Sequence, residues 1–173
     1  GVGAKRRAPL DRRRTTPDDA ATHQRTSAMP RSHPGVSVRK APYGKGLYAT
    51  RRFRKGQQIG EISGRIIHDP DYGSDYCIEM GPGGSMEPFA PWRYLNHACE
   101  PNCQLFSLHE DDDCPPEDRT IVLEAIRNVQ PDAQLTIDYE WSAENAIRCG
   151  CGGPNCRGWV VAEDELHLVT ERS

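Results

Sequence analysis

Glycine and proline interrupt the apolar stretches of this sequence along its length, and this limits the folds that the chain can adopt. There are 16 Gly and 14 Pro among 173 residues. No window keeps a long apolar stripe with the period of a helix, so helices should be few and short. The short runs between the breakers have the spacing of strands. The pattern therefore predicts a mostly β chain with several short sheets.

Eight segments after Pro34 are predicted strands, and turn residues separate them. These segments are 36–40, 46–50, 57–62, 65–67, 76–80, 104–108, 120–127 and 134–138. The clearest breakers are the turn at 54–56, the Gly-Pro-Gly-Gly run at 81–84, the acidic loop at 110–118 and the turn at 130–132. The length fits one domain, and an apolar fraction of 36% indicates a modest core.

The first 34 residues differ in charge from the rest of the chain. They contain eight Lys or Arg and three acidic residues, a net charge of +5, whereas the remainder has 14 basic and 22 acidic residues, a net charge of -8. Residues 1–34 bury too little apolar surface to offset chain entropy, so we predict a disordered basic arm. The arm is either a solvated tail or a weak contact to nucleic acid, while the acidic body favours basic partners.

Seven cysteines are present, and Cys149, Cys151 and Cys156 lie close together in the sequence. Cysteines separated by one residue are awkward disulfide partners but can bind one metal ion together. The glycines and the proline among them let the backbone curl around a tetrahedral zinc ion. A fourth ligand must come from another cysteine or from one of the six histidines. The alternative is a loose tail of free or oxidised thiols.

The cysteines also bear on cellular location. An odd number of cysteines with metal-ligand spacing indicates a reducing, intracellular compartment. No run approaches the roughly 18 apolar residues of a membrane span, and the first residues lack the apolar stretch of a secretory signal. We therefore expect an intracellular protein that makes no membrane contact.

Three further motifs are ambiguous when each is taken alone. Asn96 and His97 precede Cys-x-Pro-Asn-Cys, which fits either a second metal half-site or a buried hydrogen-bonding turn. Tyr139 closes an apolar strand, where a tyrosine is usually a core residue with its hydroxyl satisfied at the rim. The Gly-Lys-Gly run at 44–46 indicates only a tight turn or a close approach of the backbone.

The order of these motifs is more specific than any one of them. Gly-Lys-Gly-Leu at 44–47 is followed by Asn-His-Ala-Cys-Glu-Pro-Asn at 96–102 and by Asp-Tyr at 138–139. The cysteine cluster, which continues with Arg-Gly, comes last. This order resembles a SET domain with its post-SET zinc segment, and the resemblance covers residues 34–161.

The resemblance implies a fold and domain boundaries. The fold is the β-clip of SET domains, with a C-terminal pseudoknot and a four-cysteine zinc tail. The boundaries are a SET domain at 35–141, a post-SET zinc segment at 142–161 and a C-terminal tail at 162–173. The implied activity is S-adenosylmethionine-dependent N-methylation of a lysine in a basic protein, histone-like or other.

The resemblance also implies roles for individual residues. Tyr139 matches the catalytic tyrosine, and Tyr76 matches a second tyrosine lining the channel through which the lysine reaches the cofactor. The implied cofactor-binding residues are Lys45, Gly46, Arg93, Tyr94, Asn96, His97 and Trp159. The implied ligands of one structural zinc ion are Cys99, Cys149, Cys151 and Cys156.

One departure from the family pattern affects the product. Ile137 stands where the family usually has Phe or Tyr, which leaves room in the site and predicts successive methylation to di- or trimethyl-lysine.

Two other functional classes fit part of the sequence. A non-catalytic SET-like module would bind a basic protein or a chromosome through the acidic body and the basic arm. A zinc-ribbon nucleic-acid protein would explain the cysteines and the arm but not the Asn-His and Asp-Tyr motifs.

Overall fold

The computed structural model describes residues 2–3, 5–6, 33–69, 71–81, 84–109 and 114–170. Within these residues the chain is mostly β, with one short α-helix and three turns of 3-10 helix, as the sequence predicted. The strands are β1 (Val2–Gly3), β2 (Lys5–Arg6), β3 (Val36–Ala41), β4 (Gly44–Ala49), β5 (Gln58–Glu61), β6 (Gly64–Ile67), β7 (Ile78–Glu79), β8 (Ser85–Pro88), β9 (Asn96–His97), β10 (Cys103–Ser107), β11 (Ile121–Ala125), β12 (Thr136–Ile137), β13 (Ile147–Arg148) and β14 (Trp159–Val160). The helices are η1 (Trp92–Tyr94), η2 (Ala143–Asn145), η3 (Glu163–Glu165) and α1 (Leu166–Thr170).

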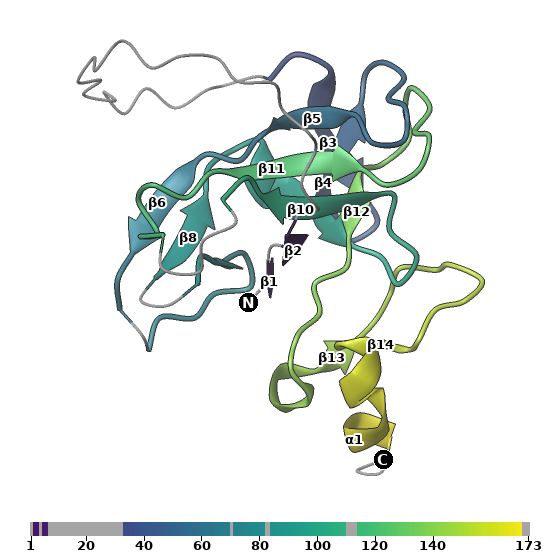
Figure 1. Cartoon of the computed structure of the whole chain (residues 1–173). Helices are drawn as coiled ribbons and strands as arrows, with labels where there is room; N and C mark the ends of the chain where they lie inside the picture. Colours follow the sequence, from purple (N-terminus) through teal and green to yellow (C-terminus); the bar gives the residue numbers. More distant parts are fainter. Residues whose placement is uncertain are drawn as a thin grey trace.

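The strands form several small sheets. One four-stranded sheet has the order β1-β7-β8-β6, and a second has the order β2-β10-β11-β5. Three pairs complete the fold: the hairpin β3-β4, the parallel pair β9-β12 and the antiparallel pair β13-β14. Figure 1 shows β11 and β10 across the middle of the molecule, with β13, β14 and α1 in a C-terminal lobe below them.

The core lies around the second sheet and the hairpin. Every residue of β11 is buried because β10 and β5 flank it and both of its faces are covered. Leu105, Leu123 and Leu135 are among the buried side chains of this core, together with Leu47 and Phe53. Full burial of one such side chain stabilises a fold by about 1.5–3 kcal/mol, so these residues hold the framework of the site.

The parallel pairing of β9 with β12 brings together two segments that are far apart in sequence. Thr136 lies opposite Asn96, and Ile137 lies opposite His97. Asn102 fixes this register with its side chain, since its Oδ1 accepts the Thr136 N–H at 3.0 Å and its Nδ2 donates to the Gln134 carbonyl at 2.8 Å. The Asn-His motif and the strand that leads to Tyr139 are therefore neighbours.

The structure differs from the sequence prediction at the amino terminus. β1 and β2 lie within residues 1–34, which the composition predicted to be disordered. They pair in parallel with β7 and β10, and each forms one edge of a four-stranded sheet. Backbone pairing at a sheet edge needs no apolar side chains, so composition does not reveal it. The remainder of the predicted arm up to residue 32, and residues 110–113 of the acidic loop, lie outside the described residues.

Strand β8 was also missed. Only Met86 and Pro88 of its four residues are buried, and the segment contains a glutamate and a proline. It is nevertheless the central strand between β6 and β7, with antiparallel pairing on both sides. Among the helices in the described part of the chain, none has the length and hydropathy to cross a membrane.

Candidate functional site

Two tyrosines line one small cavity. The cavity has a volume of about 20 Å³. Its lining residues are Asp75, Tyr76, Ile78, Pro88, Trp92, Arg93, Leu95, Leu105, Ile137 and Tyr139. Tyr76 and Tyr139 are 63 residues apart in the sequence, yet both line this cavity. Most of its lining is apolar or aromatic, and a space of this volume holds about one water molecule.

The phenol of Tyr139 is held in one orientation. Its hydroxyl donates a hydrogen bond to the Leu95 carbonyl at 2.7 Å. The ring also lies 5.5 Å from the His97 ring and 5.4 Å from the Trp141 ring, measured between centroids. Burial, together with the nearby Tyr76 and Asp75, raises the pKa of Tyr139 to about 12. The phenol is therefore a fixed, neutral hydrogen-bonding group at neutral pH.

Asn96 connects β9 to the Gly-Lys-Gly segment of β4. Its Nδ2 donates to the Lys45 carbonyl at 3.0 Å. The Lys45 ammonium in turn lies 5.2 Å from the centre of the Tyr94 ring. An amide, a backbone carbonyl, an ammonium and an aromatic face thus meet at one place, and such a set can bind both the charged and the flat parts of a small molecule.

His97 is buried and uses both of its ring nitrogens within the protein. Nδ1 accepts the backbone N–H of Tyr139 at 3.2 Å, and Nε2 lies 3.4 Å from Cys99 Sγ. Because Nδ1 is an acceptor, the proton of the neutral ring is assigned to Nε2, which donates to the sulfur. Burial lowers the pKa of His97, and the Asp138 carboxylate opposes this. The imidazole is a rigid neutral link from Tyr139 to Cys99.

A second link joins the same two regions through Asp138. Arg157 donates two hydrogen bonds to the carboxylate of Asp138, at 2.7 and 2.8 Å. The two side chains are only 13% and 17% exposed. The backbone N–H of Arg157 also donates to Cys99 Sγ at 3.4 Å. The C-terminal cysteine segment is therefore tied directly to the residue that precedes Tyr139.

Four cysteine sulfurs gather below the hairpin. The Sγ atoms of Cys99, Cys149, Cys151 and Cys156 all lie within 4.8 Å of one another, and Cys99 and Cys149 are 3.7 Å apart. Zinc–sulfur bonds of about 2.3 Å in a tetrahedron separate the sulfurs by about 3.8 Å, so the four thiols fit zinc. Backbone N–H groups of residues 151, 157 and 158 point at three of the sulfurs.

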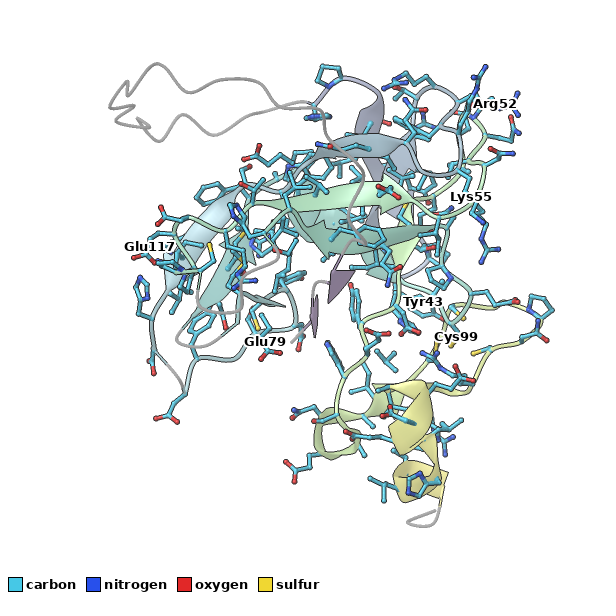
Figure 2. The ribbon with its side chains drawn as sticks, in the orientation of Figure 1. Tyr43, Arg52, Lys55, Glu79, Cys99 and Glu117 are labelled. Carbon is cyan, nitrogen blue, oxygen red and sulfur yellow. The ribbon has the colours of Figure 1, made fainter. Side chains whose placement is uncertain are left out.

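The hairpin contacts this cysteine segment. A Cβ atom at Gly150, between two of the cysteines, would lie 2.7 Å from the ring of Tyr43. Figure 2 shows Tyr43 and the yellow sulfur of Cys99 close together at the junction of the two lobes. The close approach explains a glycine at position 150, because any side chain there would displace the tyrosine. The turn that precedes Lys45 is thereby placed against the cysteine loop.

An acidic cleft leads to the two tyrosines. It has a volume of about 900 Å³ and runs between the loop before β7 and the segment after Trp141. Asp69, Asp75 and Glu79 line it, and no lysine or arginine does so among the described residues. Asp75 lines the small cavity as well, so the cavity opens beside the cleft. The cleft is suited to a basic, extended segment.

A known family has these elements in the same order. The family model of the SET domain matches residues 44–140, which is more than half of the chain. The chain belongs to the SET-domain family. The match includes the Gly-Lys-Gly segment, the Asn-His motif and Tyr139, and it ends before the last three cysteines.

Curated relatives of this SET domain are histone-lysine methyltransferases by name. "Histone-lysine N-methyltransferase trr" of Drosophila melanogaster is 30% identical over 139 residues, covering 68% of this chain and 5% of that protein. "Histone-lysine N-methyltransferase, H3 lysine-4 specific" of Emericella nidulans is 35% identical over 111 residues, covering 60% and 9%. The chain thus spans less than a tenth of the length of these two relatives.

Solved structures support the fold. A crystal structure of KRYPTONITE in complex with mCHH DNA, H3(1-15) peptide and SAH matches with a TM-score of 0.62 at 22% identity, over 72% of this chain and 29% of that one. A Plasmodium falciparum putative histone methyltransferase matches with a TM-score of 0.52 at 20% identity, over 64% of this chain and 97% of that one. At these identities the likeness is one of SET-domain fold.

The structure brings most of the site residues predicted from the sequence into two groups. Tyr139 and Tyr76 line the same cavity, and the sulfurs of the four cysteines lie within 4.8 Å of one another, as described above. Arg93 lies over the Tyr76 ring at 4.7 Å and 3.7 Å from the Glu87 carboxylate, and it lines the tyrosine cavity. Trp159 lies under the Arg148 guanidinium in the C-terminal lobe.

The structure suggests another reason for a glycine at position 46 than the one that the sequence suggested. The sequence prediction was a close approach to the cofactor. In the structure, a Cβ at this position would lie 2.5 Å from the Gln134 side chain and 3.2 Å from Ala41. The Ala41 Cβ and the Gln134 side chain therefore leave little room for a side chain here.

Two residues of the SET domain's site were missed by sequence reasoning. The Leu95 carbonyl, which orients the Tyr139 hydroxyl, is a backbone group and leaves no mark in the sequence. Arg157 directly follows the last cysteine, but nothing in the sequence pairs it with Asp138. A buried ion pair between residues 19 apart becomes visible only in the structure.

Proposed function

We propose that this chain is a protein-lysine N-methyltransferase that uses S-adenosylmethionine. The observation that carries the proposal is the fixed phenol of Tyr139, which shares a narrow cavity with Tyr76. Its hydroxyl is hydrogen-bonded to the carbonyl of Leu95, the residue that precedes Asn96. An enzyme that transfers a methyl group to an amine needs a tunnel with a cofactor at one end and an extended substrate at the other. The acidic cleft and the Asn96 side supply these two faces.

The residues around Asn96 fit the cofactor. S-adenosylmethionine, when bound, would supply a methyl group on a positively charged sulfur, next to an amino-acid part and a flat base. Asn96, the Lys45 carbonyl and the Lys45 ammonium offer polar partners for the amino-acid part, and Tyr94 offers an aromatic face. His97 has both ring nitrogens occupied, so its contribution to binding would come from its backbone. Gly46, Arg93 and Trp159 stay as further proposed contacts.

Tyr139 acts by orientation in this mechanism. With its pKa raised to about 12 by burial, the phenol stays protonated and does not accept the proton of the substrate ammonium. Free lysine has a pKa of about 10.4, and transfer into a dry cavity disfavours its charged form. The proton therefore leaves to solvent before the amine enters. Tyr139 and Tyr76 then align the lone pair, which is the main source of rate in a positioned displacement.

The cleft supports a substrate lysine that lies within a basic segment. Its three carboxylates attract basic neighbours of the target lysine and repel acidic segments. Rim charges of this kind chiefly affect the rate of encounter and the salt dependence of binding. A histone-like tail has this chemistry, as does any other basic extended segment. The thiolate site also supports an intracellular location, where cysteines stay reduced.

Ile137 supports more than one round of transfer. It is buried and lines the tyrosine cavity, and it brings no hydroxyl that could hold a water molecule there. A monomethylated lysine can therefore re-enter, and we expect di- or trimethyl-lysine as the final product. Mass spectrometry that finds only monomethyl-lysine after long incubation with a good substrate would contradict this expectation.

The test is transfer of labelled methyl groups from S-adenosylmethionine to a panel of basic peptides by the zinc-loaded chain. We expect lysine labelling, and a loss of about 100-fold or more in Tyr139→Phe, because that variant lacks the orienting hydroxyl. Tyr43→Phe is the matched control, since its exposed hydroxyl lies away from the cavity, and it should keep activity. Equal rates for Tyr139→Phe and wild type would refute the proposed role.

A further inference from the structure

Two neighbouring loops concentrate positive charge at one end of the molecule. Residues 50–57 join β4 to β5, and residues 126–135 join β11 to β12. Together they contain five basic residues and one acidic residue, whereas the rest of residues 35–173 contains nine basic and 21 acidic residues. We call the five exposed basic residues the basic patch: Arg51, Arg52, Arg54, Lys55 and Arg127. The negative net charge of the body conceals this patch.

The two loops hold each other in place. Phe53 and Val129 exchange backbone hydrogen bonds of 3.0 and 2.9 Å. The Lys55 N–H donates to Asn128 Oδ1 at 3.1 Å. Phe53 is fully buried, with two exposed basic residues on each side of it in the sequence, so its ring anchors the middle of the first loop in the core. The charges stand on a fixed backbone, and little main-chain ordering opposes binding.

The protein does not neutralise the charges of the basic patch. Among the described residues, no ion pair joins any of the five to a carboxylate. Asp132, the one acidic residue of the two loops, is paired with Arg39 at 2.6 Å. The Arg51 guanidinium lies 4.3 Å from the centre of the Phe53 ring, a contact that leaves its charge in place. Like charges gathered on adjacent loops favour a partner that carries several negative groups in a row.

The chemistry of the surface selects among such partners. Neither loop exposes a large hydrophobic side chain among the described residues, whereas protein partners use an apolar interface core and single strands of nucleic acid stack on exposed aromatic rings. Four of the five basic residues are arginines, whose planar guanidinium groups bind phosphate oxygens through two parallel hydrogen bonds. The exposed amides of Asn128 and Gln130 are uncharged groups of the kind that contact phosphates. The set matches the backbone of a duplex, which carries one negative charge per about 1.7 Å of axis.

We propose that the basic patch binds the phosphate backbone of double-stranded nucleic acid without reading its sequence. Figure 2 shows Arg52 and Lys55 at one end of the molecule, with Glu79 and Glu117 on the opposite side. Glu79 lines the acidic cleft, and its carboxylate repels phosphates. A duplex on the basic patch therefore leaves the cleft open to a basic segment. Binding at this surface does not require the proposed methyl transfer.

The test is fluorescence anisotropy of a labelled DNA duplex of about 20 base pairs, titrated with the zinc-loaded 173-residue chain at salt concentrations of about 25–200 mM. Phosphate contacts release counterions, so the logarithm of the affinity falls with the logarithm of the salt concentration, by about 0.9 per contact. The double variant Arg52→Gln/Arg54→Gln should therefore reduce this salt slope by about 1.8 and weaken binding by about tenfold or more at about 100 mM salt.

The matched control is the double variant Arg65→Gln/Arg148→Gln, which removes the same charge from exposed residues of β6 and β13. It should keep the salt slope of the wild type. Both variants retain every basic residue among the first 34, so a slope that falls only in the first variant assigns the contact to the basic patch. Lys55→Gln alone should reduce the slope by about 0.9, which gives a second measurement from a single exposed substitution.

Four outcomes would overturn the inference. The contact lies elsewhere if the slope is unchanged in Arg52→Gln/Arg54→Gln, and it reflects net charge alone if the slope falls equally in the control. Equal or tighter binding of a single strand of the same length contradicts the assignment to a duplex. Binding of phosphatidylserine vesicles without binding of the duplex makes a lipid surface the partner. Absence of duplex binding at about 25 mM salt, where phosphate contacts are strongest, leaves the patch without this role.

Discussion

The buried ion pair of Arg157 and Asp138 should stabilise the fold more than an exposed ion pair with similar hydrogen-bond distances. It joins the cysteine segment to the residue before Tyr139, so its removal loosens both the metal loop and the tyrosine. We consider the variants Arg157→Ala and Asp138→Ala and the double variant. The exposed pair of Arg39 and Asp132, with an equally short contact of 2.6 Å, provides the matched cycle.

The expected magnitudes follow from geometry and exposure. The buried pair has two charge-assisted hydrogen bonds, and a hydrogen bond to a charged group contributes about 1.5–3 kcal/mol net. The two bonds share one pair of groups and are not additive, so we expect a coupling free energy of about 2–3 kcal/mol. The side chains of the control pair are 41% and 74% exposed. Water and salt screen such a pair, and its coupling should be below about 1 kcal/mol.

The assay is urea unfolding of the zinc-loaded chain, followed by tryptophan fluorescence, for the four members of each cycle. The cycle cancels the separate effects of each residue, including the contact of Asp138 with His97. Equal coupling in the two cycles, or coupling near zero for the buried pair, would refute the reasoning that burial and bidentate geometry fasten the C-terminal lobe.

Three further predictions concern single side chains. Cys151→Ser should lower bound zinc below about one ion per chain, measured by elemental mass spectrometry, whereas Cys114→Ser should leave it unchanged. Tyr139 has a pKa raised to about 12 by burial, so its stabilising effect should be complete below about pH 10 and lost as the pH rises toward 12. The difference in phenolate absorbance between wild type and Tyr139→Phe measures this, and a titration centred near pH 10 would contradict it. Burial also raises the pKa of Cys103 to about 12, so brief alkylation of the native chain should modify Cys114 and spare Cys103.

Much of the site was predictable because its motifs occur in a specific order along the sequence. The Asn-His motif, Tyr139 and the cysteine cluster each carry chemistry that few other residues can supply. The structure brings the four cysteines together and pairs β9 with β12, as a shared site requires. Strands such as β10 and β11 were also predicted to within a few residues, because their buried positions alternate or run continuously in apolar residues.

The rest depended on contacts that sequence patterns do not encode. The central strand β8 is defined by its two neighbours rather than by its composition. The Tyr139 hydroxyl is oriented by a main-chain carbonyl, and Arg157 finds its partner through the fold of the cysteine loop. The strands β1 and β2 form in a polar segment because sheet edges provide backbone partners.

Calorimetric titration of the zinc-loaded chain with S-adenosylmethionine tests most directly whether the Asn96 side of the tunnel binds the methyl donor. The account predicts binding of one molecule per chain, weakened by about tenfold or more in Asn96→Ala. Asn128→Ala should bind like wild type, because that side chain contacts only the turn at Lys55 among the described hydrogen bonds. An absence of binding heat at millimolar cofactor would contradict the account and favour an inert SET-like binding module.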